Sequence, residues 1–326
     1  MLARLLRFTY LVQFLTGSLL GVWGLAKWTP NWDATSMALI VFAGLGWIVF
    51  WQAVVIGMTM FRSRAAGPLG PWLQAMWGEF IAALLIFGLR MPWTTSNPGI
   101  LMATDLPPSG QNALPVLLVH GFLSNHRVWD KVVLALREAG HTVLSVDLEP
   151  LFTSIDDYAP QIERAVASLS AATGATKVAL LGHSMGGLVI RAWLRAHGAQ
   201  KAAKIITLGT PHLGTQARQW LTTPNGAQTK WQSAWLSELT HAEAPSTRNL
   251  MQLAITRHDN IVHPQRQQVL DGAGVTEFSG MGHLQMCLSD EVITWLRSQL
   301  AAPDVNINIE QNKLHSRQIP TRKPTT

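Results

Sequence analysis

The sequence predicts an α/β fold, a mostly parallel sheet with helices on both faces, preceded by an N-terminal transmembrane helical segment. Three observations predict this arrangement. Short apolar runs alternate with amphipathic stretches over residues 115–300, a Gly-x-Ser-x-Gly turn at Gly182–Gly186 joins one such run to a helical stretch, and residues 1–93 carry few charges. Alternating strands and helices form parallel sheets, whose binding sites lie at the carboxyl ends of the strands.

Three long apolar runs predict two or three membrane spans within residues 1–93. Phe8–Ala26 and Ala34–Phe61 are free of charge, and a helix of about 20 residues crosses a hydrocarbon layer of about 30 Å. The third run, Pro71–Leu89, includes Glu79, which we expect to face the helix bundle or an interface. These runs predict a membrane anchor for the rest of the chain.

The number of spans decides the side on which the following domain lies. The first run has a cleaved signal peptide as its alternative, because Gly24–Ala26 resembles a cleavage site, but the apolar run that follows favours a retained anchor. Basic residues that flank the first two runs should face the cytoplasm: Arg4, Arg7, Arg62 and Arg64. Three spans then place the domain on the non-cytoplasmic side, periplasmic or extracellular, and two spans leave it in the cytoplasm.

The remaining charge and composition narrow the class of protein. Charged residues are only 13% of the chain, about half of the usual share. The net charge of +6 forms no basic stripe with interleaved aromatic residues, so we expect no nucleic-acid partner. The single cysteine, Cys287, has no intramolecular disulfide partner and is expected to fill an apolar core position.

The elements of the α/β domain follow in chain order. Residues 94–114 are predicted to be a linker, residues 115–300 the domain itself, and residues 301–326 a disordered tail. We expect strands at Pro115–Val119, Thr142–Val146, Lys177–Leu181, Ala203–Leu208, Asn249–Thr256 and Val275–Phe278. We expect helices at Val128–Ala139, Asp157–Ala172, Leu188–Ala196 and Cys287–Leu300.

The Gly-x-Ser-x-Gly segment predicts a nucleophile elbow, a sharp turn between a strand and a helix. Ser184 would stand above the sheet at the helix N-terminus, which favours negative charge. Gly182 and Gly186 are expected because the strand and the helix pass close to them. Ser184 is therefore the candidate nucleophile.

A serine hydroxyl needs a base at neutral pH, and a histidine base needs a carboxylate that fixes its tautomer. His283 lies in a glycine-rich loop after a predicted strand, which suits a base that reaches the elbow. Between Ser184 and His283 the chain offers two aspartates, and Asp259, just past a strand, is preferred to Asp271, which lies in a turn. The order serine, aspartate, histidine is the hydrolase order.

The negative oxygen of a tetrahedral intermediate requires two backbone N–H donors. Met185 follows the nucleophile and offers one, and Phe122, in the loop after the first strand, offers the other. Gly121 would allow the close approach of that loop. His120 and His183 are expected to form structural hydrogen bonds rather than to act as bases.

Five segments in this order resemble the bacterial lipase and esterase branch of the α/β-hydrolase superfamily. They are His120-Gly121-Phe122 after its strand, Gly182–Gly187, Leu208–Thr215, Asp259–Val262 and Gly282-His283. The resemblance covers about residues 115–300 and leaves the membrane segment outside. It implies cleavage of acyl esters, including lipids, through an acyl-serine intermediate on Ser184, with Asp259 and His283 as its partners. It also implies that the oxyanion is held by Phe122 and Met185.

The resemblance does not decide which molecule accepts the acyl group, nor where the cap lies. We expect an acyl ester or lipid substrate, a membrane bilayer as partner, no cofactor and no metal. The alternatives are an acyltransferase that uses an acceptor other than water, and a non-catalytic membrane partner protein with the hydrolase fold. Residues 216–248 are predicted to be a short cap in which Trp231, Trp235 and Leu239 form one helical face, either beside the site or packed on the core.

Overall fold

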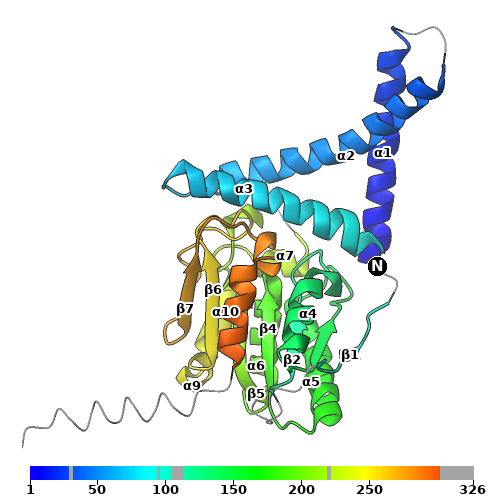
Figure 1. Cartoon of the computed structure of the whole chain (residues 1–326). Helices are drawn as coiled ribbons and strands as arrows, with labels where there is room; N and C mark the ends of the chain where they lie inside the picture. Colours follow the sequence, from blue (N-terminus) through cyan, green and yellow to red (C-terminus); the bar gives the residue numbers. More distant parts are fainter. Residues whose placement is uncertain (29–31, 94–95, 105–112, 219–221, 302–326) are drawn as a thin grey trace, which may run out of the picture.

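Three long apolar helices precede an α/β domain in the computed structural model, which describes residues 1–28, 32–93, 96–104, 113–218 and 222–301 (Figure 1). The helices are α1 (Leu2–Leu25), α2 (Ala34–Arg62) and α3 (Leu69–Ala83), and α3 continues as the π-helix η1 (Leu84–Arg90) and the short 3-10 helix Met91–Trp93. Three helical stretches, Leu2–Leu25, Ala34–Arg62 and Leu69–Trp93, are long and apolar enough to cross a membrane.

Glycines allow α1 and α2 to pack closely. A Cβ atom on Gly17 would lie 2.4 Å from the Cβ of Trp47, and one on Gly44 would lie 2.6 Å from the hydroxyl of Ser18. Both distances are too short for a real side chain, so the two helix backbones approach where only glycine fits. Small residues at such crossings are typical of packed membrane helices.

The α/β domain is built on a seven-stranded sheet with the order β1-β3-β2-β4-β5-β6-β7. The strands are β1 (Ile100–Leu101), β2 (Val116–Val119), β3 (Val143–Val146), β4 (Val178–His183), β5 (Ala202–Leu208), β6 (Met251–Thr256) and β7 (Gly274–Phe278). Among the strands of the described residues, β1 alone is antiparallel to its neighbour, β3, and the other pairs are parallel. The predicted mostly parallel sheet is confirmed, and β1 lies within the stretch predicted as linker.

Helices cover both faces of this sheet (Figure 1). The longer ones are α4 (Asp130–Glu138), α5 (Ala159–Thr173), α6 (Met185–His197) and α10 (Asp290–Leu300). Strand β2 shows why both faces are covered. Leu117 and Val119 belong to the core cluster that includes α5 and α6, whereas Val116 and Leu118 belong to the one that includes α4 and α10. Successive side chains of a strand point to opposite faces, so a strand buried on both faces is apolar throughout.

The last predicted helix differs from the one observed. The last helix was expected from Cys287, but a 3-10 helix, η6 (Leu284–Cys287), precedes it and α10 starts at Asp290. The side chain of Ser289 accepts from the N–H of Val292 and caps the start of α10, and the prediction overlooked this N-cap signal. Cys287 is fully buried, as predicted.

The region predicted as a cap contains the short helices α7 (Pro224–Gln228), α8 (Ala234–His241) and α9 (Pro245–Arg248). The single face expected for Trp231, Trp235 and Leu239 is wrong for Trp231, which lies in a turn before α8 because Ser233 caps that helix. Leu236 is buried in the core cluster of α5 and α6, and Trp235 packs against it. Helix α8 therefore packs on the core.

Helices α2 and α3 lie across the α/β domain at the carboxyl ends of its parallel strands (Figure 1). Glu79 of α3 is fully buried in this interface, as expected for the one acidic residue of the third apolar run. The helical segment is thus part of the surface above the sheet and is not separated from the domain.

Candidate active site

Ser184 occupies a strained turn between β4 and α6. Its φ of 56° and ψ of −129° lie outside the conformations that side-chain-bearing residues favour. A Cβ atom on Gly182 would lie 2.5 Å from the backbone nitrogen of Gly187, and one on Gly186 would lie 2.1 Å from the carbonyl oxygen of Val119. The predicted strand, turn and helix are confirmed, and both glycines are needed for the reason predicted. Such strain is typical of functional turns.

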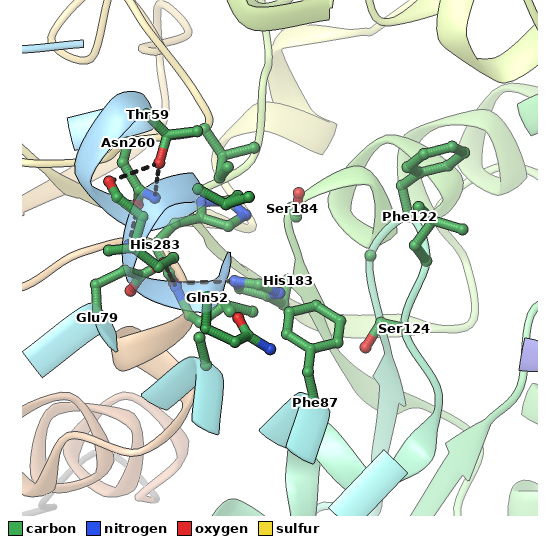
Figure 2. A pocket seen from close by; sticks show the side chains of 17 residues that line it. Gln52, Thr59, Glu79, Phe87, Phe122, Ser124, His183, Ser184, Asn260 and His283 are labelled. Atoms are coloured by element: carbon green, nitrogen blue, oxygen red, sulfur yellow. Dashed lines mark hydrogen bonds between the residues drawn. The ribbon is translucent and has the colours of Figure 1, made fainter. Parts of the chain in front are cut away.

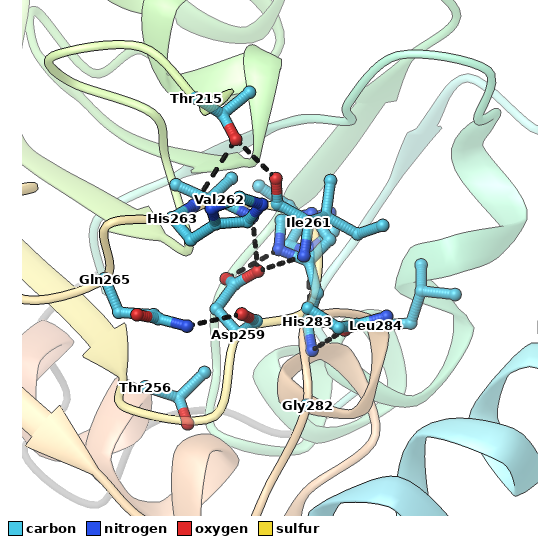
Figure 3. A network of polar contacts seen from close by, with 12 residues as sticks. Thr215, Thr256, Asp259, Ile261, Val262, His263, Gln265, Gly282, His283 and Leu284 are labelled. Carbon is cyan, nitrogen blue, oxygen red and sulfur yellow. Dashed lines mark hydrogen bonds and ion pairs between the residues drawn. The ribbon is translucent and has the colours of Figure 1, made fainter. Parts of the chain in front are cut away.

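Asp259 and His283 form a buried pair (Figure 3). The His283 Nδ1 atom lies 2.8 Å from Asp259 Oδ2, and Asp259 Oδ1 accepts from the N–H groups of Ile261 and Val262 at 2.8 Å and 2.6 Å. An ionised carboxylate can only accept, so Nδ1 carries the hydrogen, and in the neutral imidazole Nε2 then keeps the lone pair. This is the orientation that a general base requires.

Ser184 and His283 line one cavity of about 200 Å³ (Figure 2). The hydrogen bonds of His283 within the described residues go to Asp259, Asn260 and His183 rather than to the Ser184 hydroxyl. Bonds between a nucleophile and its base are often long before substrate binds. The structure therefore brings Ser184 and His283 to the same cavity, with Asp259 directly behind the imidazole. Asp271, the alternative carboxylate, lies in an exposed turn.

The loop after β2 passes beside the nucleophile. A Cβ atom on Gly121 would lie 2.7 Å from the Cβ of Ser184, so only glycine permits this approach. Phe122 and Leu123 follow and line the same cavity, and Leu123 has a φ of 51°, unusual for a residue with a side chain. Met185 is the first residue of α6, where backbone N–H groups have no acceptor within the helix.

His120 and His183 hold the loops of the site. The carbonyl oxygen of Gly121 lies 2.8 Å from His120 Nδ1, and the N–H of Leu148 donates to His120 Nε2 at 3.0 Å. His183 Nε2 donates to the carbonyl oxygen of His283 at 3.2 Å. Burial lowers the pKa of both imidazoles below the usual value, because the charged form would lose its hydration. Both contacts fit the structural role predicted for these histidines.

The N-terminal helices contribute groups to the site that the sequence did not assign. Thr59 of α2 accepts from the side-chain amide of Asn260 at 3.0 Å, and the amide oxygen of Asn260 accepts from the N–H of His283 at 3.2 Å. Both oxygens of the Glu79 carboxylate accept backbone N–H groups, those of Leu284 and Gln285, each at 3.0 Å. The sequence signal that could have identified these contacts is the presence of polar residues inside otherwise apolar runs.

No group of three or more His, Cys, Asp and Glu side chains within the described residues is arranged to hold a metal ion. The site consists of a strained serine, a histidine and carboxylate pair and backbone donors. This set of groups suits nucleophilic catalysis by the chain's own residues.

The fold and the site together define the class of this domain. Residues 115–271 match the family model described as alpha/beta hydrolase fold. The parallel sheet, the elbow after β4 and the loops beyond β6 and β7 are arranged as this class requires. This match and the parallel sheet show that the chain contains the α/β-hydrolase fold, and the motifs within it resemble the bacterial lipase and esterase branch.

Two bacterial lipases are similar to part of this chain in sequence. It is 33% identical over 164 residues to a triacylglycerol lipase of Burkholderia plantarii, covering 48% of this chain and 42% of that protein. It is 37% identical over 111 residues to a triacylglycerol lipase of Pseudarthrobacter phenanthrenivorans, covering 31% of this chain and 34% of that protein. The chain thus matches less than half the length of either relative.

Among solved structures, the mature lipase BlEst2 of Bacillus licheniformis is similar, with a TM-score of 0.52 and 15% sequence identity. The match covers 62% of this chain and 99% of that structure. At this identity the likeness shows a shared fold.

Proposed function

We propose that this protein is a membrane-anchored serine hydrolase that cleaves carboxylic acyl esters through an acyl-enzyme on Ser184. The observation that carries the proposal is the 2.8 Å contact between His283 Nδ1 and Asp259 Oδ2 behind a cavity that also contains Ser184. The partial similarity to two triacylglycerol lipases supports an ester substrate.

The proposed reaction has two steps that share one base. The His283 Nε2 atom takes the Ser184 proton while the Ser184 oxygen bonds the ester carbonyl carbon, and the N–H groups of Phe122 and Met185 stabilise the negative oxygen. The carbon–oxygen bond to the alcohol then breaks, and His283 gives that alcohol its proton. Water attacks the acyl-serine with the same base and releases the carboxylic acid.

Replacement of the nucleophile tests this proposal. Purified full-length Ser184→Ala should hydrolyse p-nitrophenyl butyrate at a rate reduced by several orders of magnitude, leaving at most the residual catalysis that binding and oxyanion donors provide, about 10³–10⁴-fold over water. Ser145→Ala, a buried serine of β3 outside the cavity, is the matched control. An unchanged rate in Ser184→Ala would contradict the proposal.

Two further measurements separate the alternatives. If an acceptor other than water is preferred, added alcohol will yield a new ester at the expense of the free acid. A protein that only uses the fold as a membrane partner will not react with a fluorophosphonate probe, whereas the proposed enzyme should be labelled at Ser184 and the Ser184→Ala variant should not.

The same proposal places the protein in a membrane as a multi-pass chain. If Leu69–Trp93 crosses the bilayer with α1 and α2, the hydrolase domain lies on the non-cytoplasmic side. Buried polar contacts from α3 to the hydrolase domain, such as Glu79 to Leu284, support a position of α3 along the membrane surface, which leaves the domain in the cytoplasm. Alkaline phosphatase fused after Leu300 is active only in the first arrangement.

A further inference from the structure

The cavity beside Ser184 has one wall that the hydrolase domain does not supply. Seven of its 17 lining residues belong to α2, α3 and η1 (Figure 2). On α2 these are Gln52, Val55, Ile56 and Thr59, whose spacing of three and four residues defines a single helical face. Ala83 and Phe87, one helical turn apart, line the cavity from α3 and η1.

Hydrogen bonds hold this wall to the loops that carry Asp259 and His283. The Thr59 hydroxyl accepts from Asn260, and the backbone oxygen of Ser63 accepts from the side chain of Gln265 at 2.8 Å. The same Gln265 amide donates to the backbone oxygen of Asp259 at 2.9 Å. The end of α2 is therefore fixed to the segment around the acid of the proposed triad.

The cavity reaches the surface beside α2. Val55 lines the cavity and is 45% exposed, so this side chain lies between the cavity and the outer surface of α2. The most apolar 18-residue stretch of α2 has a mean hydropathy of 2.3, and only 11% of that stretch is buried within the protein. A helix of this kind faces lipid when it is in a bilayer. The side of the cavity at Val55 therefore faces the hydrocarbon region or its edge.

We propose that α2, α3 and η1 form the acyl-binding wall of this enzyme, and that its substrate is an ester of a bilayer lipid whose acyl chain enters beside Val55. This rests on the function proposed for Ser184 and adds a substrate class and a route. The apolar members of this wall, Val55, Ile56, Ala83 and Phe87, favour an acyl chain because its burial removes hydrocarbon from water. A volume of about 200 Å³ is below the 300–1,000 Å³ of pockets for drug-sized ligands, so one chain enters and the head group stays outside.

A pair of matched variants tests the route. Val55 and Val49 are both valines of α2 with similar exposure, 45% and 42%, but only Val55 lines the cavity. Full-length protein in phosphatidylcholine nanodiscs is assayed with p-nitrophenyl acetate, which is water-soluble, and p-nitrophenyl dodecanoate, which partitions into the bilayer. In Val55→Trp the ratio of kcat/KM for dodecanoate to that for acetate should fall by at least tenfold. In Val49→Trp the ratio should stay within twofold of the wild-type value.

The outcomes distinguish the two proposals. If the wild-type protein hydrolyses neither ester, the function proposed for Ser184 fails. If it hydrolyses both and Val55→Trp keeps the wild-type ratio, the helical wall is refuted while the hydrolase function stands. Phe87→Ala provides a second test, because it removes bulk from the same cavity. It should raise kcat/KM for p-nitrophenyl palmitate relative to that for p-nitrophenyl dodecanoate. No change in that preference also overturns the proposal.

Discussion

Replacement of Glu79 by alanine tests whether the third apolar helix positions the loop that carries His283. Glu79 is fully buried, and its two carboxylate oxygens accept the N–H groups of Leu284 and Gln285, the residues directly after His283. A Cβ atom on Gly282 would lie 2.6 Å from Glu79 Oε2, so the carboxylate packs tightly against the same loop. Helix α3 thus holds both sides of His283.

The expected cost follows from the two donors that alanine leaves without an acceptor. A buried donor that loses its partner costs about 1–3 kcal/mol, and Leu284 and Gln285 are only half-buried, so we expect about 2–4 kcal/mol in total. Part of this cost should appear as displacement of the loop. A shift of about 1 Å at a catalytic group can lower the rate about 10²-fold. The Glu79→Ala variant should therefore lose kcat and show a lower melting temperature.

The assay compares kcat, KM and thermal unfolding of the full-length protein with p-nitrophenyl butyrate. Glu79→Gln keeps one carbonyl acceptor and should recover part of kcat, with little change in KM in either variant. Glu138→Ala is the control, since Glu138 forms an exposed ion pair with Arg297 that should contribute less than about 1 kcal/mol. Wild-type kcat and melting temperature in Glu79→Ala would refute the reasoning.

Two predictions concern stability. Arg191→Ala should lower the free energy of unfolding in urea by about 3 kcal/mol. It removes the 2.5 Å partner of the buried Glu243 carboxylate and leaves it only Arg248, at 3.3 Å. Exposed Arg195→Ala should cost under about 1 kcal/mol, and similar losses in the two variants would contradict this prediction. Burial lowers the pKa of His183 and His212 well below the usual value. Below about pH 6.5 the unfolded chain therefore binds protons that the folded chain does not, so the free energy of unfolding decreases as the pH is lowered. His212→Asn should reduce that slope by up to about 1.4 kcal/mol per pH unit, and an unchanged slope would exclude His212 as a source.

The α/β domain could be predicted because its signals are local. The elbow combines an apolar strand, two glycines and a helix within a few residues, and its backbone geometry follows from them. The meeting of Asp259 and His283 follows from topology, since both lie after neighbouring parallel strands, β6 and β7. The carboxyl ends of such strands lie at one edge of the sheet, so residues far apart in sequence come together.

The docking of the N-terminal helices could not be predicted in the same way. Helix α2 is apolar on all sides, and periodicity cannot tell a face that contacts lipid from one that contacts protein. Gln52 and Thr59, seven residues apart, were the polar residues that marked the cavity face. Glu79 could be predicted to face an interface, because a carboxylate in an apolar run must find partners, but its partners lie more than 200 residues away.

The wall that α2, α3 and η1 add to the cavity has a practical consequence. A fragment that begins after Trp93 would lack Thr59 and Glu79, and it would open the cavity and expose the apolar surface that α2 and α3 cover. Such a truncation would remove part of the proposed active site along with the proposed membrane anchor. Attempts to obtain a water-soluble form for crystallisation or biotechnology should therefore keep α2 and α3 and redesign only their outward side chains.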